Sequence, residues 1–255
     1  MDQIITENRD GILRIEINRP DKKNALTAAM YQAMADALTA ADADPKVRVV
    51  LIHGKSDLFT AGNDLQDFLD NRPRDEDRPA FQFLRNISRA QKPIVAAVAG
   101  AAVGIGTTML LHCDLVYAAP NTRLQLPFVN LGLVPEAASS LLLPALVGYQ
   151  RAAELLLLCE PFSAQTAKEI GLVNAVFPVA SFREDVDKFV AEILNKSRPI
   201  LIWTKRAIRA SLGVNFPDSL RSAEVLYLDG CMKAEDAKEG IAAFMGKRKA
   251  VWKDK

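Results

Sequence analysis

The sequence of 255 residues contains few of the side chains that build metal centres and nucleophilic triads. Its three cysteines, Cys113, Cys159 and Cys231, are far apart and form no C-x-x-C pair, which argues against a disulfide framework or a zinc site. Its two histidines, His53 and His112, stand alone, and a lone histidine beside apolar residues is more often structural than catalytic. We therefore expect no metal, no Ser-His-Asp mechanism and a reducing compartment.

The sequence has no excess of positive or negative charge. Lys and Arg number 32 against 31 Asp and Glu, so the net charge is +1 and a nucleic-acid partner is not expected. The charged runs at 71–78 and 247–255 are interpreted as solvated surface.

Targeting and membrane signals are also missing. The N-terminal MDQIITENRDG is polar and acidic, unlike a signal peptide. Pro93–Leu111 is uncharged over 19 residues, near the length of a membrane span, but it contains Gly100, Gly104 and Gly106. A buried strand, a turn and a helix start explain it better, so no membrane span is predicted.

The pattern that is present indicates a globular α/β protein, because hydrophobic residues make up 49% and charged residues 25%. Strands alternate with helices up to about residue 177, which favours largely parallel pairing. Strands are predicted at Leu13–Ile17, Val47–Ile52, Ile94–Val98, Leu115–Ala118 and Val173–Phe177. Helices are predicted at Met30–Ala41, Gly106–His112, Ala138–Leu146 and Ala152–Leu158.

The character changes after Phe177, where the patterns at Phe182–Leu194, Ile200–Ser211, Ser219–Leu228 and Ala234–Met245 are all helical. We predict a core over residues 1–195 and a helical region over 196–255. That region is too small for a strong core of its own, so it should pack on the body or on another subunit.

Two glycine-containing turns could carry chemistry. Phe59–Phe68 (FTAGNDLQDF) predicts free backbone N–H groups and a helix starting near Asp64, or simply a strand-to-helix turn capped by Asp64. Ala99–Met109 (AGAAVGIGTTM) lets a ligand approach the backbone, or serves tight helix-on-strand packing. It matches neither a dinucleotide fingerprint nor a P-loop.

Glu136 is the only charge within Leu126–Leu143 (LPFVNLGLVPEAASSLLL). It is either a helix N-terminal glutamate or a carboxylate facing an apolar pocket and poised as a base. Apolar neighbours would raise its pKa and a helix start would lower it, so the sequence leaves that pKa open.

Together with RPDKKNAL (Arg19–Leu26) and EGIAAFMGKRKAVW (Glu239–Trp252), these segments resemble the enoyl-CoA hydratase/isomerase (crotonase) superfamily over nearly the whole chain. The resemblance implies a spiral of β-β-α turns with a helical C-terminal region that mediates trimer formation. It implies an acyl-CoA substrate, no separate cofactor and a homotrimer or a hexamer.

The resemblance also implies site residues. The backbone N–H groups of Asn63 and Ile105 would bind the thioester oxygen, and two preorganised donors favour the enolate over the ground state. The implied substrate-binding residues are Ala61, Gly62, Asn63, Asp64, Leu65, Gly104 and Phe128.

Thr108 and Phe128 stand where family hydratases resemble one another in having two glutamates, so a typical hydratase mechanism is not expected. NLGLVPEAASS (Asn130–Ser140) is similar instead to the Δ3,Δ2-enoyl-CoA isomerases of peroxisomes and bacteria, in which one Glu follows a Pro. Glu136 would then be the base. The ending Lys253-Asp254-Lys255 does not match a Ser-Lys-Leu signal, which favours a bacterial cytoplasmic enzyme.

Two other functions stay open: a hydratase or other crotonase-type acyl-CoA enzyme that uses a different base, and a non-catalytic acyl-CoA-binding protein.

Overall fold

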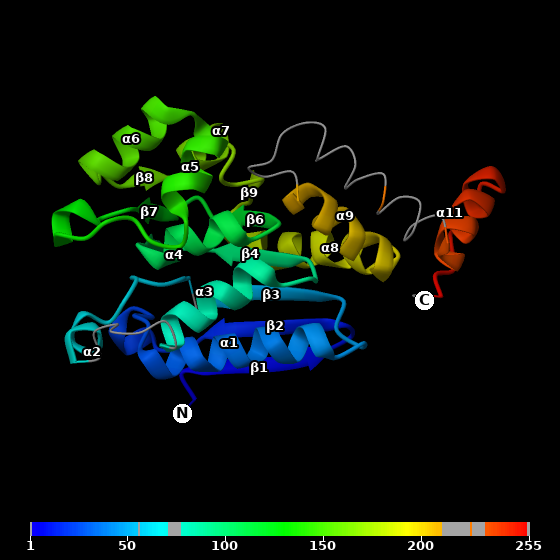
Figure 1. The fold of residues 1–255 in the computed structure, drawn as a ribbon, viewed down its shortest axis with the longest axis horizontal. Helices are drawn as coiled ribbons and strands as arrows, with labels where there is room; N and C mark the ends of the chain where they lie inside the picture. Colours follow the sequence, from blue (N-terminus) through cyan, green and yellow to red (C-terminus); the bar gives the residue numbers. More distant parts are fainter. Residues whose placement is uncertain (1, 56, 71–77, 211–224, 226–232, 254–255) are drawn as a thin grey trace.

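The computed structural model describes residues 2–55, 57–70, 78–210, 225 and 233–253. Its larger sheet has the strand order β1-β2-β3-β4-β6-β9 (Figure 1). β1 and β2 pair antiparallel, and every other neighbouring pair is parallel. These strands span Ile4–Arg9, Ile12–Ile17, Val49–Gly54, Ile94–Val98, Leu115–Ala118 and Ala175–Val176.

Both faces of this sheet are covered, which explains why β3 is buried along its whole length and apolar from Val49 to Ile52. Successive strand residues point to opposite faces. Val50 and Ile52 belong to the core that also contains residues of α1 (Ala28–Ala43) and α3 (Pro79–Arg89). Val49 and Leu51 belong to a second core with α8 (Phe182–Leu194).

A smaller sheet places the second glycine-containing turn. It consists of β5 (Ala101–Val103), β7 (Arg123–Gln125) and β8 (Phe162–Ser163), with β5 parallel and β8 antiparallel to β7. Directly after β5 comes the one-turn helix α4 (Ile105–Thr108), which continues into the 3-10 helix η2 (Met109–His112). The 3-10 helices η1, η3 and η4 span Pro20–Lys22, Val129–Leu131 and Val179–Ser181. The other helices are α2 (Leu65–Asp70), α5 (Ser139–Val147), α6 (Tyr149–Leu158), α7 (Ala164–Glu169), α9 (Arg198–Ala210) and α11 (Glu235–Met245).

The described part of the C-terminal helical region packs on the same chain. On α9, the Lys205 ammonium donates to Asp114 Oδ2 and to the Lys92 carbonyl, each at 2.6 Å. Asp236 of α11 accepts a 2.6 Å hydrogen bond from Ser197, between α8 and α9 (Figure 1). The helix predicted at Ser219–Leu228 lies outside the described residues, apart from residue 225.

The mixed α/β fold with a helical C-terminal region is confirmed, and most predicted elements are present. Two strands were placed wrongly. β3 begins at Val49 because the amide of Val47 closes a turn on the Asp44 carbonyl. β9 is shorter than Val173–Phe177 because the Val173 amide still bonds to Ala167 at the end of α7.

Other elements were not predicted at all, namely β1, β5, β7, β8, α3 and α7. Most of them are too short or too exposed for a hydrophobic period to be visible. The apolar stretch at 93–111 is β4, β5, α4 and η2. Among the described residues, no helix is both long and apolar enough to cross a membrane.

Candidate active site

An apolar cavity of about 200 Å³ lies where α1, α3, α4 and the loop before α5 meet. Its polar side chains are Tyr31, Asn63 and Glu136, and the remaining lining is aliphatic or aromatic. The lining residues are Tyr31, Asn63, Phe68, Ala80, Phe81, Leu84, Ile105, Phe128, Leu133, Val134 and Glu136. Four residues named from the sequence, Asn63, Ile105, Phe128 and Glu136, are therefore brought together from distant parts of the chain.

Asn63 and Ile105 line this cavity, and their backbone amides are not used in secondary structure. A parallel bridge pairs Leu26 with Asn63: the Leu26 amide bonds to the Gly62 carbonyl and the Asp64 amide to the Leu26 carbonyl. This register leaves the Asn63 amide unused. Ile105 is the first residue of α4, where an amide has no intrahelical acceptor. Within the described residues neither nitrogen donates a hydrogen bond.

Two glycines allow the turns that carry these amides to touch. Gly62 has φ +93°, and a Cβ on it would lie 2.8 Å from the Val103 carbonyl oxygen. A Cβ on Gly106 would lie 2.7 Å from Cγ2 of Thr60, which is fully buried between the turns. Any side chain at either position would push the two turns apart.

Gly104 acts through its conformation instead. It precedes α4 with φ +56° and ψ −117°, a geometry that side chains disfavour, and its amide bonds to the Gln125 carbonyl. This turn makes Ile105 the first residue of α4.

Glu136 is partly buried, and its carboxylate accepts a hydrogen bond from the Thr108 hydroxyl. Burial among apolar residues raises the pKa of Glu136 to about 7, although the hydrogen bond from Thr108 opposes the rise. The interpretation of Glu136 as a helix N-terminal glutamate was wrong. Ala137 and Ala138 adopt left-handed backbone conformations, and α5 begins only at Ser139.

Tyr31 lines the same cavity as Glu136 and bonds to Asn63 in one of the glycine-containing turns. Its hydroxyl donates to Asn63 Oδ1, and burial raises its pKa well above the ordinary value, with the charges of Glu136 and Asp67 adding to the rise. It stays protonated and is a hydrogen-bond donor inside the cavity.

The other residues named from the sequence are not among the residues that line the cavity. Asp64 bonds to Arg19 at 2.7 Å and accepts the Gln66 and Asp67 amides, which caps α2 as the simpler interpretation predicted. The bond to Arg19 holds the pKa of Asp64 below its usual range. Leu65 is exposed on α2, and the Ala61 amide bonds to the Lys23 carbonyl.

Sequence reasoning missed several lining residues. Tyr31 lies on the buried face of α1, and a buried tyrosine hydroxyl needs a partner, which was the available signal. Phe81 and Leu84 belong to α3, which was not predicted. Thr108 was considered only as a residue unable to move a proton, so its contact with Glu136 was not foreseen.

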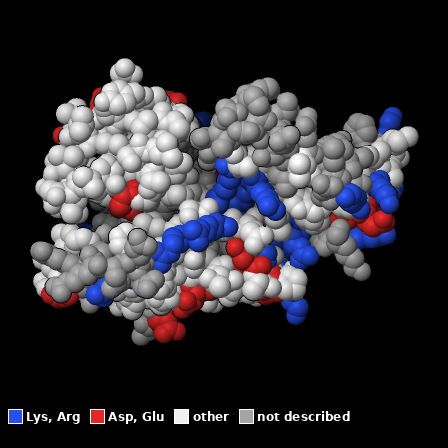
Figure 2. Space-filling model, viewed as in Figure 1, with Lys and Arg blue, Asp and Glu red and all other residues white. Residues whose placement is uncertain are grey.

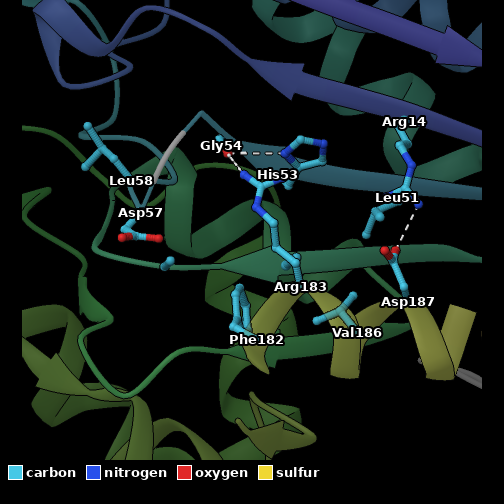
Figure 3. A pocket seen from close by; sticks show the side chains of 12 residues that line it. Arg14, Leu51, His53, Gly54, Asp57, Leu58, Phe182, Arg183, Val186 and Asp187 are labelled. Carbon is cyan, nitrogen blue, oxygen red and sulfur yellow. Dashed lines mark hydrogen bonds and ion pairs between the residues drawn. The ribbon is translucent and has the colours of Figure 1, made fainter. Parts of the chain in front are cut away.

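A smaller cavity, of about 50 Å³, lies on the α8 side of the larger sheet (Figure 3). Most of its polar side chains bond to one another or to backbone: Arg14 donates to Asp187 at 2.9 Å, and His53 Nδ1 lies 3.2 Å from the Gly54 carbonyl oxygen. Burial lowers the pKa of His53, which keeps the ring neutral. The arrangement ties β2 and β3 to α8.

Metal and thiol chemistry find little support in the described part of the chain. No group of three His, Cys, Asp or Glu side chains there could hold a metal ion. Cys113 and Cys159 are free thiols, and burial raises the pKa of Cys113 to about 12, which keeps it from ionising.

Comparison with known proteins identifies the family of the chain. The family model described as enoyl-CoA hydratase/isomerase matches residues 7–255. A crotonyl-CoA hydratase from Syntrophomonas wolfei is 34% identical, with 98% of this chain and 97% of that protein covered. A 2,3-dehydroadipyl-CoA hydratase from Escherichia coli is 32% identical, with 97% of both covered.

Among solved structures, a putative enoyl-CoA hydratase/carnithine racemase from Magnetospirillum magneticum is 44% identical over 98% of both chains, with a TM-score of 0.92. The fold is thus the crotonase fold. The chain belongs to the enoyl-CoA hydratase/isomerase family.

Proposed function

We propose that this protein is a Δ3,Δ2-enoyl-CoA isomerase that uses Glu136 as its only base. One observation carries the proposal: among the described residues that line the cavity, Glu136 is the only carboxylic acid, and it shares the cavity with Asn63 and Ile105, whose backbone amides donate no hydrogen bond within the described part of the chain. A double-bond shift needs one group that removes a proton and later returns it. It needs no second carboxylate.

The two amides would receive the thioester oxygen. When the C2 proton leaves, negative charge develops on that oxygen, and donors already in place stabilise it without reorganisation. Because the surroundings are apolar, each amide is worth more here than in water. The turn at Ala61–Leu65 and Gly104 would guide the CoA moiety toward these donors.

The reaction balances with one carboxylate. Glu136 takes the C2 proton, and the C–H electron pair forms a C1–C2 double bond while the thioester oxygen becomes the enolate oxygen. The thioester carbonyl then re-forms, and the electron pair of the C1–C2 double bond moves to make the C2–C3 double bond. The electron pair of the original C3–C4 double bond takes the proton back from Glu136 at C4. The product is the 2-enoyl-CoA, and the carboxylate is regenerated.

A pKa of about 7 suits this role. A base near the working pH is ionised in a large fraction of molecules and still binds a proton firmly enough to abstract it. The aromatic and aliphatic lining, which includes Phe68, Leu84 and Phe128, favours an uncharged acyl chain.

Hydration is the second candidate, because the similar proteins from Syntrophomonas wolfei and Escherichia coli are named hydratases. Adding water would require a second acid or base. Thr108 and Phe128 stand where the family resemblance places the two hydratase glutamates, so another base would have to act.

The experiment compares the two reactions with the wild-type protein. A 3-enoyl-CoA and crotonyl-CoA are each incubated with it, and conjugated 2-enoyl-CoA and 3-hydroxyacyl-CoA are quantified by chromatography. We expect formation of the 2-enoyl isomer and much slower hydration. Faster hydration would replace the proposal with a hydratase, and calorimetric binding of acyl-CoA without turnover would leave only a binding protein.

We also propose that the chain forms a homotrimer or a dimer of trimers. The surface over α5 and α6 carries few charges (Figure 2), and several of its apolar side chains are exposed. These are Leu141, Leu146, Tyr149, Leu157 and Leu158. Contiguous apolar surface of this kind marks protein interfaces. Light scattering on the purified protein decides the copy number. Cytoplasmic location stays a prediction from the sequence.

A further inference from the structure

Two adjacent threonines in α4 bond in different directions. Thr107 is nearly fully buried, and its hydroxyl donates to the Ala102 carbonyl at 2.6 Å. The same hydroxyl accepts a 3.2 Å hydrogen bond from the backbone amide of Gln125. Its hydroxyl therefore holds α4 against β5 and β7. Thr108, also fully buried, donates instead to Oε1 of Glu136.

The backbone of the turn that carries Glu136 is fixed separately. Ser139 donates to the Glu136 carbonyl through its hydroxyl at 2.6 Å and through its amide at 3.0 Å. His112 Nε2 lies 2.8 Å from the Ala137 carbonyl oxygen and must carry the proton, since a carbonyl only accepts. These bonds hold the main chain but leave the carboxylate free to rotate about its side-chain bonds.

We infer that Thr108 is a positioning residue, which holds Oε1 of Glu136 and leaves Oε2 as the oxygen that takes and returns the proton. This inference rests on the proposed role of Glu136 as the base. Thr108 lies one helical turn after Ile105, so the same short helix fixes both a thioester-oxygen donor and the orientation of the base.

The titratable and hydrogen-bonding groups near Glu136 come from several elements. Tyr31 reaches the cavity from α1, Thr108 comes from α4, and His112 bonds to the neighbouring carbonyl from η2. The negative charge of Asp67 on α2 adds to the rise in the pKa of Tyr31. Among these, the Thr108 hydroxyl donates directly to the carboxylate. A donor to the ionised form lowers a carboxyl pKa, so loss of the hydroxyl should raise it.

The test measures the Glu136 carboxyl directly, by ¹³C NMR titration of glutamate-labelled protein, with E136Q to assign the signal. Thr108→Val removes the hydroxyl at similar volume, and Thr108→Ser keeps it. Thr122→Val is the matched control, because Thr122 is also fully buried and donates to the Val98 carbonyl at 2.9 Å outside the cavity lining. We expect the pKa of Glu136 to rise by about one pH unit in T108V and to stay near the wild-type value in T108S and T122V.

Turnover of a 3-enoyl-CoA gives the second readout. At a pH where Glu136 is ionised in every variant, T108V should lose about tenfold in kcat with little change in KM, because the carboxylate is less well oriented. Thr108→Ser should restore most of the rate. If T108V does not fold, Thr108→Ala removes the same hydroxyl and serves in its place.

Two results would overturn the inference: a Glu136 titration in T108V that matches wild type, or a T108S variant as impaired as T108V. The NMR titration needs no turnover. A wild-type protein without isomerase activity would therefore refute the proposed function while the titration still decides whether Thr108 sets the state of the carboxylate.

Discussion

Two regions of this molecule bury ionisable side chains, and they do so in opposite ways. Between α9 and the larger sheet, Lys205 is 6% exposed and its ammonium is shared by the Asp114 carboxylate and the Lys92 carbonyl. In the apolar cavity, no Lys or Arg is among the described lining residues, and the Glu136 carboxylate accepts from the Thr108 hydroxyl. Burial displaces the pKa of both groups, lowering that of Lys205 and raising that of Glu136. The paired ammonium is held in the structure by its partners, whereas a carboxylate without a counter-charge is available for chemistry.

The largest expected effect is the loss of turnover when the Glu136 carboxylate is replaced by a neutral amide. Glu136→Gln keeps the shape and can still accept from Thr108, but it cannot take a proton. We expect kcat for a 3-enoyl-CoA to fall by about 10³-fold, the usual order for loss of a general base. A continuous assay of the conjugated product measures it.

Glu160→Gln is the matched control, because Glu160 is an exposed glutamate outside the cavity and its loss should leave kcat unchanged. Undiminished turnover by E136Q would remove Glu136 from its proposed role.

Removing the partner of Lys205 should lower the stability of the fold and leave the rate of turnover unchanged. Asp114→Ala leaves the Lys205 ammonium buried without its carboxylate, so the free energy of unfolding should fall by about 2–3 kcal/mol. This is below the cost of a fully buried pair because the Asp114 side chain is 26% exposed. Urea denaturation measures the loss, and kcat per folded molecule should not change.

The double variant Asp114→Ala with Lys205→Met sharpens the result. Removing both charges should recover part of the lost stability, since no ammonium is left uncompensated. If the double variant loses as much stability as Asp114→Ala and Lys205→Met added together, the two charges are not coupled, and packing rather than the ion pair holds α9.

The pH dependence of turnover should report the unpaired carboxylate. Glu136 acts only when ionised, and its pKa is raised to about 7. kcat/KM for the free enzyme should therefore drop about tenfold for each pH unit below 7 and level off above it. A rate that holds constant down to pH 5 would contradict a raised pKa.

The smallest effect is the stability of E136Q. Between the ordinary carboxyl pKa of 4.5 and about 7, the folded protein keeps a proton that the unfolded chain releases, so stability falls as pH rises through this range. Replacing the carboxylate should raise the free energy of unfolding at pH 8, by at most the roughly 3 kcal/mol that corresponds to this shift, and by almost nothing at pH 4. Equal denaturation curves for both proteins at pH 8 would argue against a desolvated carboxylate.

Hydrophobic patterning made much of the fold predictable. The alternation at β2, the continuous apolar run at β3 and the amphipathic period of α8 each appear in the sequence, because these long elements bury one face or both. The three-residue strands β5 and β7 could not be predicted, since each owes its existence to pairing with the other.

The candidate site divides in the same way. The sequence by itself placed a solitary glutamate in an apolar segment and glycines in two turns, because composition and spacing are local properties. Only the tertiary structure decided that Gly62 and Gly106 press those turns together and that Thr108 touches Glu136. It also set the direction of the Glu136 pKa, since desolvation depends on which residues from other elements surround a carboxylate.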